Sequence, residues 1–207
     1  MTKEEKVLEI IKRLKRIYPH PITALNFRTP FELLIATIMA AQCTDKVVNT
    51  VTPELFKKYP DAKAFSKASI EDINKMIVKV VFHNNKAKNI SAASKIIDEK
   101  YNGKVPDTLK ELTSLPGVAR KTANVVLGNA FGKNEGIAID THVMRLAPKL
   151  GLTSHVGDPV KIEEDLMKIV PQKYWSDFSN MLILTSREFY PKRAKDYSSG
   201  PLAGLFV

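Results

Sequence analysis

Apolar residues recur at helical spacing along the whole chain, and the alternation that builds β-strands is scarce. Residues 3–18, for example, place Val7, Leu14 and Ile17 in a helical pattern that two prolines then end. Helix-start signals recur as well, and the segment 29–32 combines a capping box with a proline at the first helical position. These features predict a fold that is nearly all α.

The same signals place the other helices. We expect a buried helix from Pro30 to about Gln42, one that starts at Ser69, and a lysine-rich one from about Asn85 to Tyr101. A short helix should begin at Asp107 or Thr108 and lead into a turn. Further helices are expected after this turn, at 122–130, 141–150, 159–170 and 174–189. An irregular basic tail should follow them. Two helices joined by that turn form a helix-hairpin-helix over about residues 108–131.

Charge restricts the class of partner. The 207 residues include 32 Lys and Arg against 22 Asp and Glu, a formal charge of +10 that favours an anionic partner, although a solvated lysine-rich surface is the common alternative. The longest apolar stretch, around 33–41, is too short to span a bilayer, and no signal segment opens the chain. We therefore expect an intracellular protein. Cys43 is the only cysteine, which excludes intrachain disulfides and metal sites built from several thiolates.

The turn Leu115-Pro116-Gly117-Val118-Ala119-Arg120-Lys121 is the first candidate for function. Proline and glycine are turn formers, and Gly117 permits a positive φ or a close backbone approach. Backbone N–H groups at the start of the following helix, around Gly117, Ala119 and Arg120, are expected to face outward and to bind a phosphate.

Lys121 lies in the first turn of that helix, where the positive end of the helix dipole opposes the ammonium form. A lysine in this setting can supply a free amine that attacks a sugar carbon and forms a Schiff base. The alternative is that Lys121 only contacts a phosphate, which is the more common use of such a hairpin.

Asp140 follows the buried apolar run 137–139 and stands where the next helix should begin. As an N-cap it would simply accept hydrogen bonds from the N–H groups of His142 or Val143. As a catalytic group, a fixed anion near a nucleophilic amine can stabilise positive charge on a deoxyribose ring or relay protons. His142 could line the same pocket and contact DNA, although a helix-face histidine with one hydrogen bond is the ordinary alternative.

Four segments in order resemble the endonuclease III branch of the helix-hairpin-helix DNA glycosylases. They are Ala41-Gln42-Cys43-Thr44-Asp45, Asn84-Asn85-Lys86-Ala87, residues 115–127, and Ile139-Asp140-Thr141-His142-Val143 with Arg145. The resemblance covers about residues 3–190. It implies a helical barrel at 23–134, a second helical lobe formed by 1–22 plus 135–207, and double-stranded DNA across the groove between them.

By match to the family motif, Lys121 would be the Schiff-base nucleophile and Asp140 the catalytic carboxylate. Gln42 and Phe82 match positions that push into the duplex where the damaged nucleotide is flipped out. The family usually has leucine where Phe82 stands, and without the family this residue is as easily a core aromatic. The resemblance also implies a Na⁺ or K⁺ ion between the hairpin and a phosphate.

The carbonyls of Thr113, Leu115 and Val118 match those that hold this ion in similar proteins, and unpaired turn carbonyls suit a weakly held alkali ion.

The sequence departs from the family at its end, where four cysteines normally bind a [4Fe–4S] cluster. The matching positions read Tyr190, Tyr197, Gly200 and Phe206, so we expect no cluster. Our hypothesis is that the three aromatic residues fill the vacated space by apolar packing. The basic residues Lys192, Arg193 and Lys195 lie in this region, where they could contact DNA phosphates or simply be solvated.

The resemblance implies a bifunctional DNA glycosylase and abasic-site lyase that removes oxidised pyrimidines in base-excision repair. It would act as a monomer in the cytoplasm, associated with the nucleoid, and without a membrane. One alternative keeps the fold but changes the lesion to mismatched thymine or uracil, adenine, or an alkylated base. Another is a non-catalytic DNA-binding module, which would require neither Lys121 nor Asp140.

Overall fold

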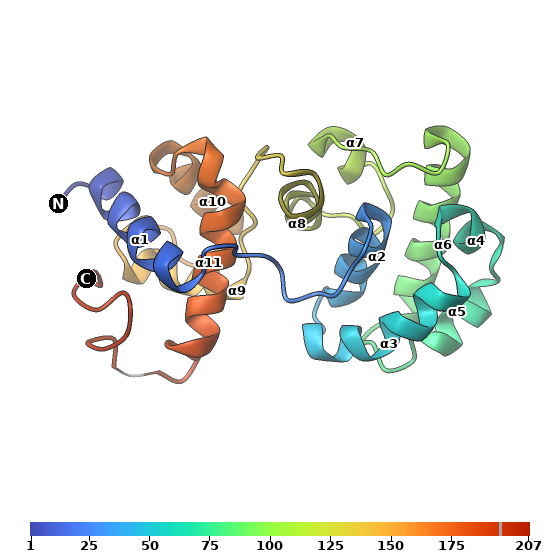
Figure 1. The fold of residues 1–207 in the computed structure, drawn as a ribbon, viewed down its shortest axis with the longest axis horizontal. Coiled ribbons are helices and arrows are strands. Elements are labelled where there is room, and N and C mark those ends of the chain that lie inside the picture. Colours follow the sequence, from blue (N-terminus) through green and yellow to red (C-terminus); the bar gives the residue numbers. More distant parts are fainter. Residues whose placement is uncertain (195) are drawn as a thin grey trace. The chain divides into compact units, whose positions relative to one another are not determined.

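The computed structural model describes residues 1–194 and 196–207, and every regular element in them is helical (Figure 1). This confirms the all-α prediction. The first elements are α1 (Lys3–Ile17), α2 (Pro30–Ala40), α3 (Asp45–Lys58), α4 (Ala62–Lys67), α5 (Ile70–Met76) and α6 (His83–Tyr101). They are followed by α7 (Leu109–Thr113), α8 (Arg120–Phe131), α9 (Thr141–Lys149), α10 (Pro159–Ile169), the 3₁₀ helix η1 (Gln172–Tyr174) and α11 (Trp175–Glu188).

Most helices begin where a short polar side chain caps the free N–H groups. Thr29, Ser69, Thr108 and Asp140 each accept a hydrogen bond from the first turn of the helix that follows, as the sequence predicts. The helices α3 and α4 were not expected from the sequence. Pro53 lies inside α3, where it removes one backbone hydrogen bond, so the pattern does not resemble an ordinary helix.

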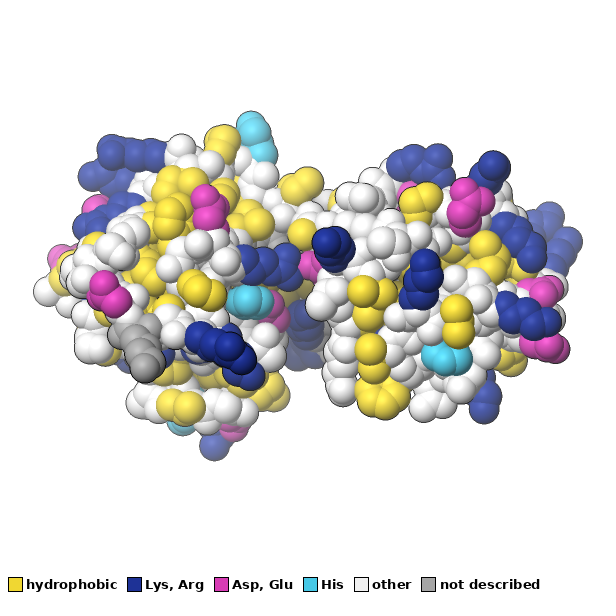
Figure 2. Space-filling model, turned by 90° about the horizontal axis from the view of Figure 1, so that it is seen from below, with side chains coloured by type: hydrophobic (Ala, Val, Ile, Leu, Met, Phe, Trp, Pro, Cys, Tyr) yellow, Lys and Arg dark blue, Asp and Glu magenta, His cyan; other side chains and the backbone are white. Residues whose placement is uncertain are grey.

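The chain divides into two compact units. We call residues 24–132 the central unit, and residues 1–23 together with 133–207 the terminal unit. Each unit has its own cluster of buried apolar side chains. On the face drawn in Figure 2, basic side chains are present on both units.

The core of the central unit surrounds α2, in which every residue from Phe31 to Met39 is buried. This helix packs against α8, α3 and α6, while α4 and α5 pack against α6. A helix that is apolar on all sides can only be stable in such an interior. The ends of α2, α6 and α8 therefore have fixed positions within this unit.

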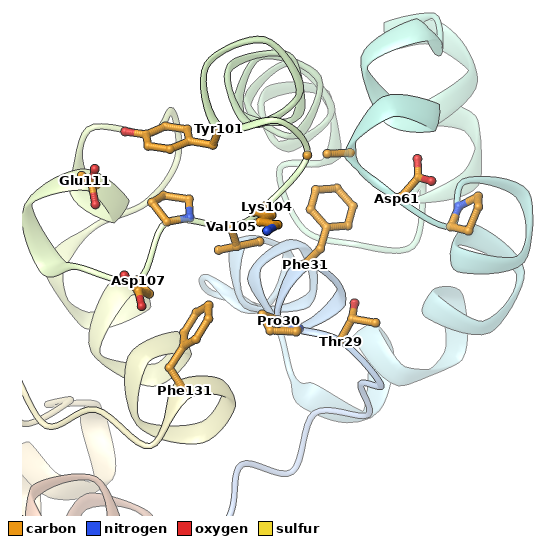
Figure 3. A pocket seen from close by; sticks show the side chains of 14 residues that line it. Thr29, Pro30, Phe31, Asp61, Tyr101, Lys104, Val105, Asp107, Glu111 and Phe131 are labelled. Carbon is orange, nitrogen blue, oxygen red and sulfur yellow. The ribbon is translucent and has the colours of Figure 1, made fainter.

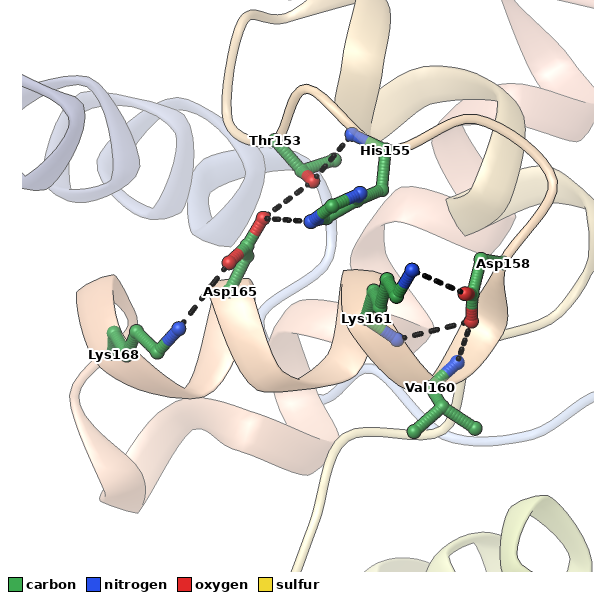
Figure 4. A network of polar contacts seen from close by, with 7 residues as sticks. All are labelled: Thr153, His155, Asp158, Val160, Lys161, Asp165 and Lys168. Carbon is green, nitrogen blue, oxygen red and sulfur yellow. Dashed lines mark hydrogen bonds and ion pairs between the residues drawn. The ribbon is translucent and has the colours of Figure 1, made fainter.

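The core of the terminal unit lies between α1, α9, α10 and α11. Side-chain pairs on α10 also fasten the loop that precedes it (Figure 4). Thr153 donates a hydrogen bond of 2.7 Å to Asp165, and His155 and Lys168 lie 3.7 and 3.4 Å from the same carboxylate. Among the described residues, no helix is long and apolar enough to cross a membrane.

Candidate active site and nucleic-acid interface

The hairpin joins α7 to α8 through a tight turn in the central unit. Gly117 has φ +78°, and a Cβ added there would lie 2.9 Å from the Cβ of Asn89 on α6. Only glycine fits this close approach with this backbone conformation. The N–H of Val118 donates to the carbonyl of Leu115 at 3.2 Å, which closes the turn.

The start of α8 differs from most helix starts in this chain because its N-cap residue, Ala119, has no side-chain oxygen to accept a hydrogen bond. Arg120 and Lys121 follow in the first turn, and both are exposed. Exposed N–H groups beside two cations form a site that attracts an anion such as a phosphate.

Asp140 is the N-cap of α9 in the terminal unit. Its Oδ1 accepts hydrogen bonds from the N–H groups of His142 at 2.8 Å and Val143 at 2.9 Å. The backbone before it is also held, since the N–H of Ile137 donates to buried Glu163 and Ser179 Oγ donates to the carbonyl of Ala138. Asp140 is therefore a half-buried carboxylate with a fixed position.

Further polar contacts extend from this cap into the unit. Nδ1 of His142 lies 2.8 Å from Ser186 Oγ, which in turn accepts a hydrogen bond of 2.5 Å from Arg145 Nη2. Arg145 also donates to the carbonyl of Tyr190 and, through Nη1, to the hydroxyl of Tyr197 at 3.0 Å. The first two turns of α9 are thus anchored to α11 and to the segment after it. The helix-face hydrogen bond anticipated for His142 is present.

Tyr190 and Tyr197 belong to the aromatic group that the resemblance matches to the family's cluster cysteines. The Tyr190 and Tyr197 rings stack with centroids 5.5 Å apart, and Phe206 meets them edge-on at 5.0 and 4.8 Å. The Tyr190 hydroxyl donates to the carbonyl of Ser199 and accepts from the N–H of Leu202. These three rings pack together, as the sequence hypothesis requires.

Gly200, the fourth position, touches the same group, since a Cβ there would lie 2.8 Å from the Tyr190 hydroxyl. Two α1 side chains fasten the loop around it. Arg13 donates to the carbonyls of Pro201 and Ala203, and Lys6 donates to that of Leu205. The C-terminal segment is therefore held by an aromatic cluster and by basic side chains. Within residues 1–194 and 196–207, no group of three or more His, Cys, Asp or Glu side chains could hold a metal ion.

Gln42 and Phe82 share an unusual backbone conformation. Among the described residues, only Gln42, Phe82 and Asn102 have a positive φ without being glycine, with values of 55°, 58° and 52°. Left-handed backbone at a bulky residue is strained, and such strain gathers at functional sites. The Phe82 residue is 59% exposed, so the alternative that it is a core aromatic is wrong.

Lys86 links the loop of Gln42 to the start of α6, which Phe82 precedes. Its ammonium donates to the carbonyls of Met39 at 2.7 Å and Ala41 at 2.5 Å, at the end of α2. Burial lowers its pKa, and the nearby Cys43 raises it by a smaller amount. The sequence places Lys86 in one of the four segments that resemble the family, but sequence reasoning assigned it no role.

A signal for Lys86 was nevertheless present, because the lysine shares a helical face with Ile90, Ala93 and Ile97, all fully buried. A lysine on such a face needs partners for its ammonium group.

The predicted site residues thus divide between the two units. The hairpin, Gln42 and Phe82 belong to the central unit, where α6 contacts Gly117 through Asn89 and reaches Ala41 through Lys86. Asp140, His142 and the exposed Lys192 and Arg193 belong to the terminal unit. Lys195 lies outside the described residues.

Comparison with known proteins identifies the protein family. Residues 35–172 match the model of the HhH-GPD superfamily of base excision DNA repair proteins, and the chain belongs to that superfamily. Endonuclease III of Synechocystis sp. is 47% identical over 203 residues, which cover 98% of this chain and 90% of that protein. Endonuclease III of Escherichia coli is 42% identical over 183 residues, covering 88% and 85%.

Comparison with a solved structure also points to the endonuclease III family. A trapped covalent intermediate of an endonuclease III with DNA, in an estranged-adenine complex, has a TM-score of 0.91 and 37% identity, and the match covers 100% of this chain and 96% of that one. Within the superfamily, the chain belongs to the endonuclease III family. It is a base-excision repair DNA glycosylase and abasic-site lyase.

Proposed function

We propose that Lys121 is the nucleophile and Asp140 the catalytic carboxylate of this enzyme, acting on oxidised pyrimidines in double-stranded DNA. The observation that carries the proposal is the exposed Lys121 in the first turn of a helix whose N-cap offers no side-chain oxygen. A phosphate bound to the backbone N–H groups at this helix start would place the neighbouring deoxyribose near the amine.

In the reaction, the neutral Lys121 amine attacks C1′ and the damaged base leaves with the bond's electron pair, taking up a proton. The nitrogen loses a proton and the sugar ring opens to a Schiff base. Removal of a proton from C2′ then expels the 3′ phosphate, which cuts the strand by β-elimination. Water finally releases the sugar from Lys121.

Asp140 contributes a fixed negative charge. Because Oδ1 is occupied by two backbone N–H groups, Oδ2 is the oxygen that can face the sugar as it becomes cationic. Ser186 and Arg145 position this cap rather than touch the substrate.

We further assign Gln42 and Phe82 as the side chains that enter the duplex. An aromatic ring can replace lost base stacking, and an amide can hydrogen-bond the unpaired base. Gly117, Ala119 and Arg120 would contact a phosphate at the hairpin, and His142, Lys192, Arg193 and Lys195 would contact the DNA from the terminal unit.

The carbonyls of Thr113, Leu115 and Val118 would hold a Na⁺ or K⁺ ion that offsets the phosphate charge. Leu115 can take part because its carbonyl, which accepts from Val118, keeps a second lone pair. We propose that no iron–sulfur cluster is bound, since tyrosines, a glycine and a phenylalanine stand where its ligands would be. Analysis of purified protein for iron and acid-labile sulfide tests this, and about four irons per chain would reject it.

The lesion is tested by comparing duplexes that contain thymine glycol, a thymine mismatch, adenine opposite oxidised guanine, or an alkylated base. We expect thymine glycol to be released fastest, with strand cleavage on its 3′ side. Asp140→Asn should slow base release far more than it weakens DNA binding, because its charge matters only as the sugar becomes cationic. Base release from a mismatch without strand cleavage would favour the other lesion classes.

A further inference from the structure

A cavity of about 700 Å³ opens in the central unit (Figure 3). Its walls come from the starts of α2 and α4, the end of α6, the segment that leads into α7, and the end of α8. This volume lies within the range of about 300–1,000 Å³ that is typical of ligand sites.

The cavity lies at the opposite helix ends from the residues proposed to bind DNA. Lys121 is at the start of α8 and Phe131 at its end, and Phe82 precedes α6 whereas Tyr101 ends it. α2 likewise begins at the cavity and ends beside Gln42. Helices of 11, 12 and 19 residues separate these ends by about 16–28 Å. The cavity is therefore separate from the proposed active site.

The floor of the cavity is apolar and rigid. Phe31 is buried beneath it, Val105 and Phe131 are half-buried, and Pro30 and Pro106 fix the backbone of two wall segments. Such a surface needs no rearrangement before an apolar side chain enters.

Carboxylates flank this floor on two sides. In Figure 3, Asp61 lies on one side of Phe31, and Asp107 and Glu111 lie on the other. Lys104 is the single basic residue among the described residues that line the cavity. The charged side chains of the lining are therefore net negative, opposite in sign to the chain's net charge of +10.

Helix ends of both kinds meet at the cavity. α6 and α8 end beside the cavity, at Asn102 and Gly132, so their carbonyl ends contribute partial negative charge. The helices that begin there are capped by the side chains of Thr29, Asp61 and Thr108. This arrangement is the opposite of the uncapped hairpin, and it disfavours phosphate.

We propose that the cavity binds a short segment of a partner protein in which an apolar or aromatic residue is flanked by lysine or arginine. The apolar side chain would occupy the floor over Phe31, and the flanking cations would face Asp61 on one side and Asp107 on the other. Carboxylates on both sides of an apolar floor fit an extended segment better than a ligand with one charge. This role is independent of the proposed chemistry at Lys121.

The probe is the peptide acetyl-Arg-Leu-Phe-Arg-amide, titrated into the full chain by calorimetry, with the matching Glu-Leu-Phe-Glu peptide as a control. We expect the basic peptide to bind and the acidic one not to bind. Asp61→Asn and Asp107→Asn should each weaken binding about two- to fivefold, and asparagine still caps α4. Asp72→Asn, on α5 outside the cavity, should change nothing.

Equal binding of both peptides, or unchanged binding by Asp61→Asn and Asp107→Asn, would overturn the proposal. Cleavage of an abasic duplex by the same variants should stay at the wild-type rate, which separates this test from the test of the active site. Self-association that sediments as a dimer and is lost in Asp61→Asn would instead assign the cavity to a second copy, and would also overturn it.

Discussion

Replacing Lys86 by methionine tests how the loop of Gln42 and the start of α6 are held together. Methionine keeps an unbranched apolar stem but donates no hydrogen bond. The Lys86 residue is 6% exposed, and its ammonium donates to two carbonyls at 2.7 and 2.5 Å. Two such charge-assisted bonds contribute about 3–6 kcal/mol, and desolvation of the ammonium offsets part of this. We expect a net loss of about 2 kcal/mol in the free energy of unfolding.

Urea unfolding followed by circular dichroism measures this loss. Lys88→Met, an exposed lysine on the same helix, is the matched control and should stay within about 0.5 kcal/mol of the wild type. Binding to an abasic duplex should weaken for Lys86→Met only, because Gln42 and Phe82 lose their shared anchor. Equal stability of the two variants, with unchanged DNA affinity, would refute this assignment.

The contribution of Lys86 to the free energy of unfolding should change with pH in a defined direction. Burial lowers its pKa in the folded state below the ordinary value of 10.5, so the unfolded chain binds the proton more tightly. The contribution of Lys86 to stability is therefore largest above pH 10.5 and falls as pH drops through the lowered pKa. Wild-type stability should rise relative to Lys86→Met as pH increases toward 10.5, and a constant difference would contradict this.

Three further predictions concern other parts of the molecule. Tyr190→Ala should lower the free energy of unfolding by about 3–5 kcal/mol, because it removes the ring of a residue that is only 1% exposed and leaves a cavity. A loss under about 1 kcal/mol in urea titrations would show that the aromatic cluster is not a stabilising core. Phe82→Ala should leave stability within about 0.5 kcal/mol but weaken binding to an abasic duplex in fluorescence anisotropy, and unchanged affinity would exclude Phe82 as a wedge. The hydrogen bond from Thr153 lowers the pKa of Asp165 below its ordinary 3.8, so the stabilisation by the Asp165 carboxylate is present above pH 3.8 and lost as pH falls through the lowered pKa. The amount by which Asp165→Asn lowers the melting temperature should therefore shrink in acid. A difference in melting temperature that is constant with pH would contradict this.

Local signals predicted much of the fold. The start of α2 at Thr29 and Pro30, and that of α9 at Asp140, follow from capping chemistry that acts over three or four residues. The same local reasoning failed for α3, whose stability depends on burying Val48 and Leu55 in the central core despite Pro53.

The site required contacts that no local pattern contains. Lys86 reaches carbonyls 47 and 45 residues away, and Arg145 reaches Tyr190 and Tyr197 at separations of 45 and 52 residues. Such pairs depend on how helices pack, which periodicity does not specify. The motif around Asp140 and its hydrogen bonds to the next helical turn could be found in the sequence, but the distant contacts of Arg145 that hold this helix could not.

The central claim is that Lys121 forms the covalent bond to DNA, and borohydride trapping tests it most directly. The enzyme is incubated with a thymine-glycol duplex and with an abasic duplex, reduced, digested with a protease, and the peptide that carries the sugar is identified by mass spectrometry. We predict one adduct, on Lys121, and none in Lys121→Gln. An adduct on another residue, or trapping that persists in Lys121→Gln, would contradict the account.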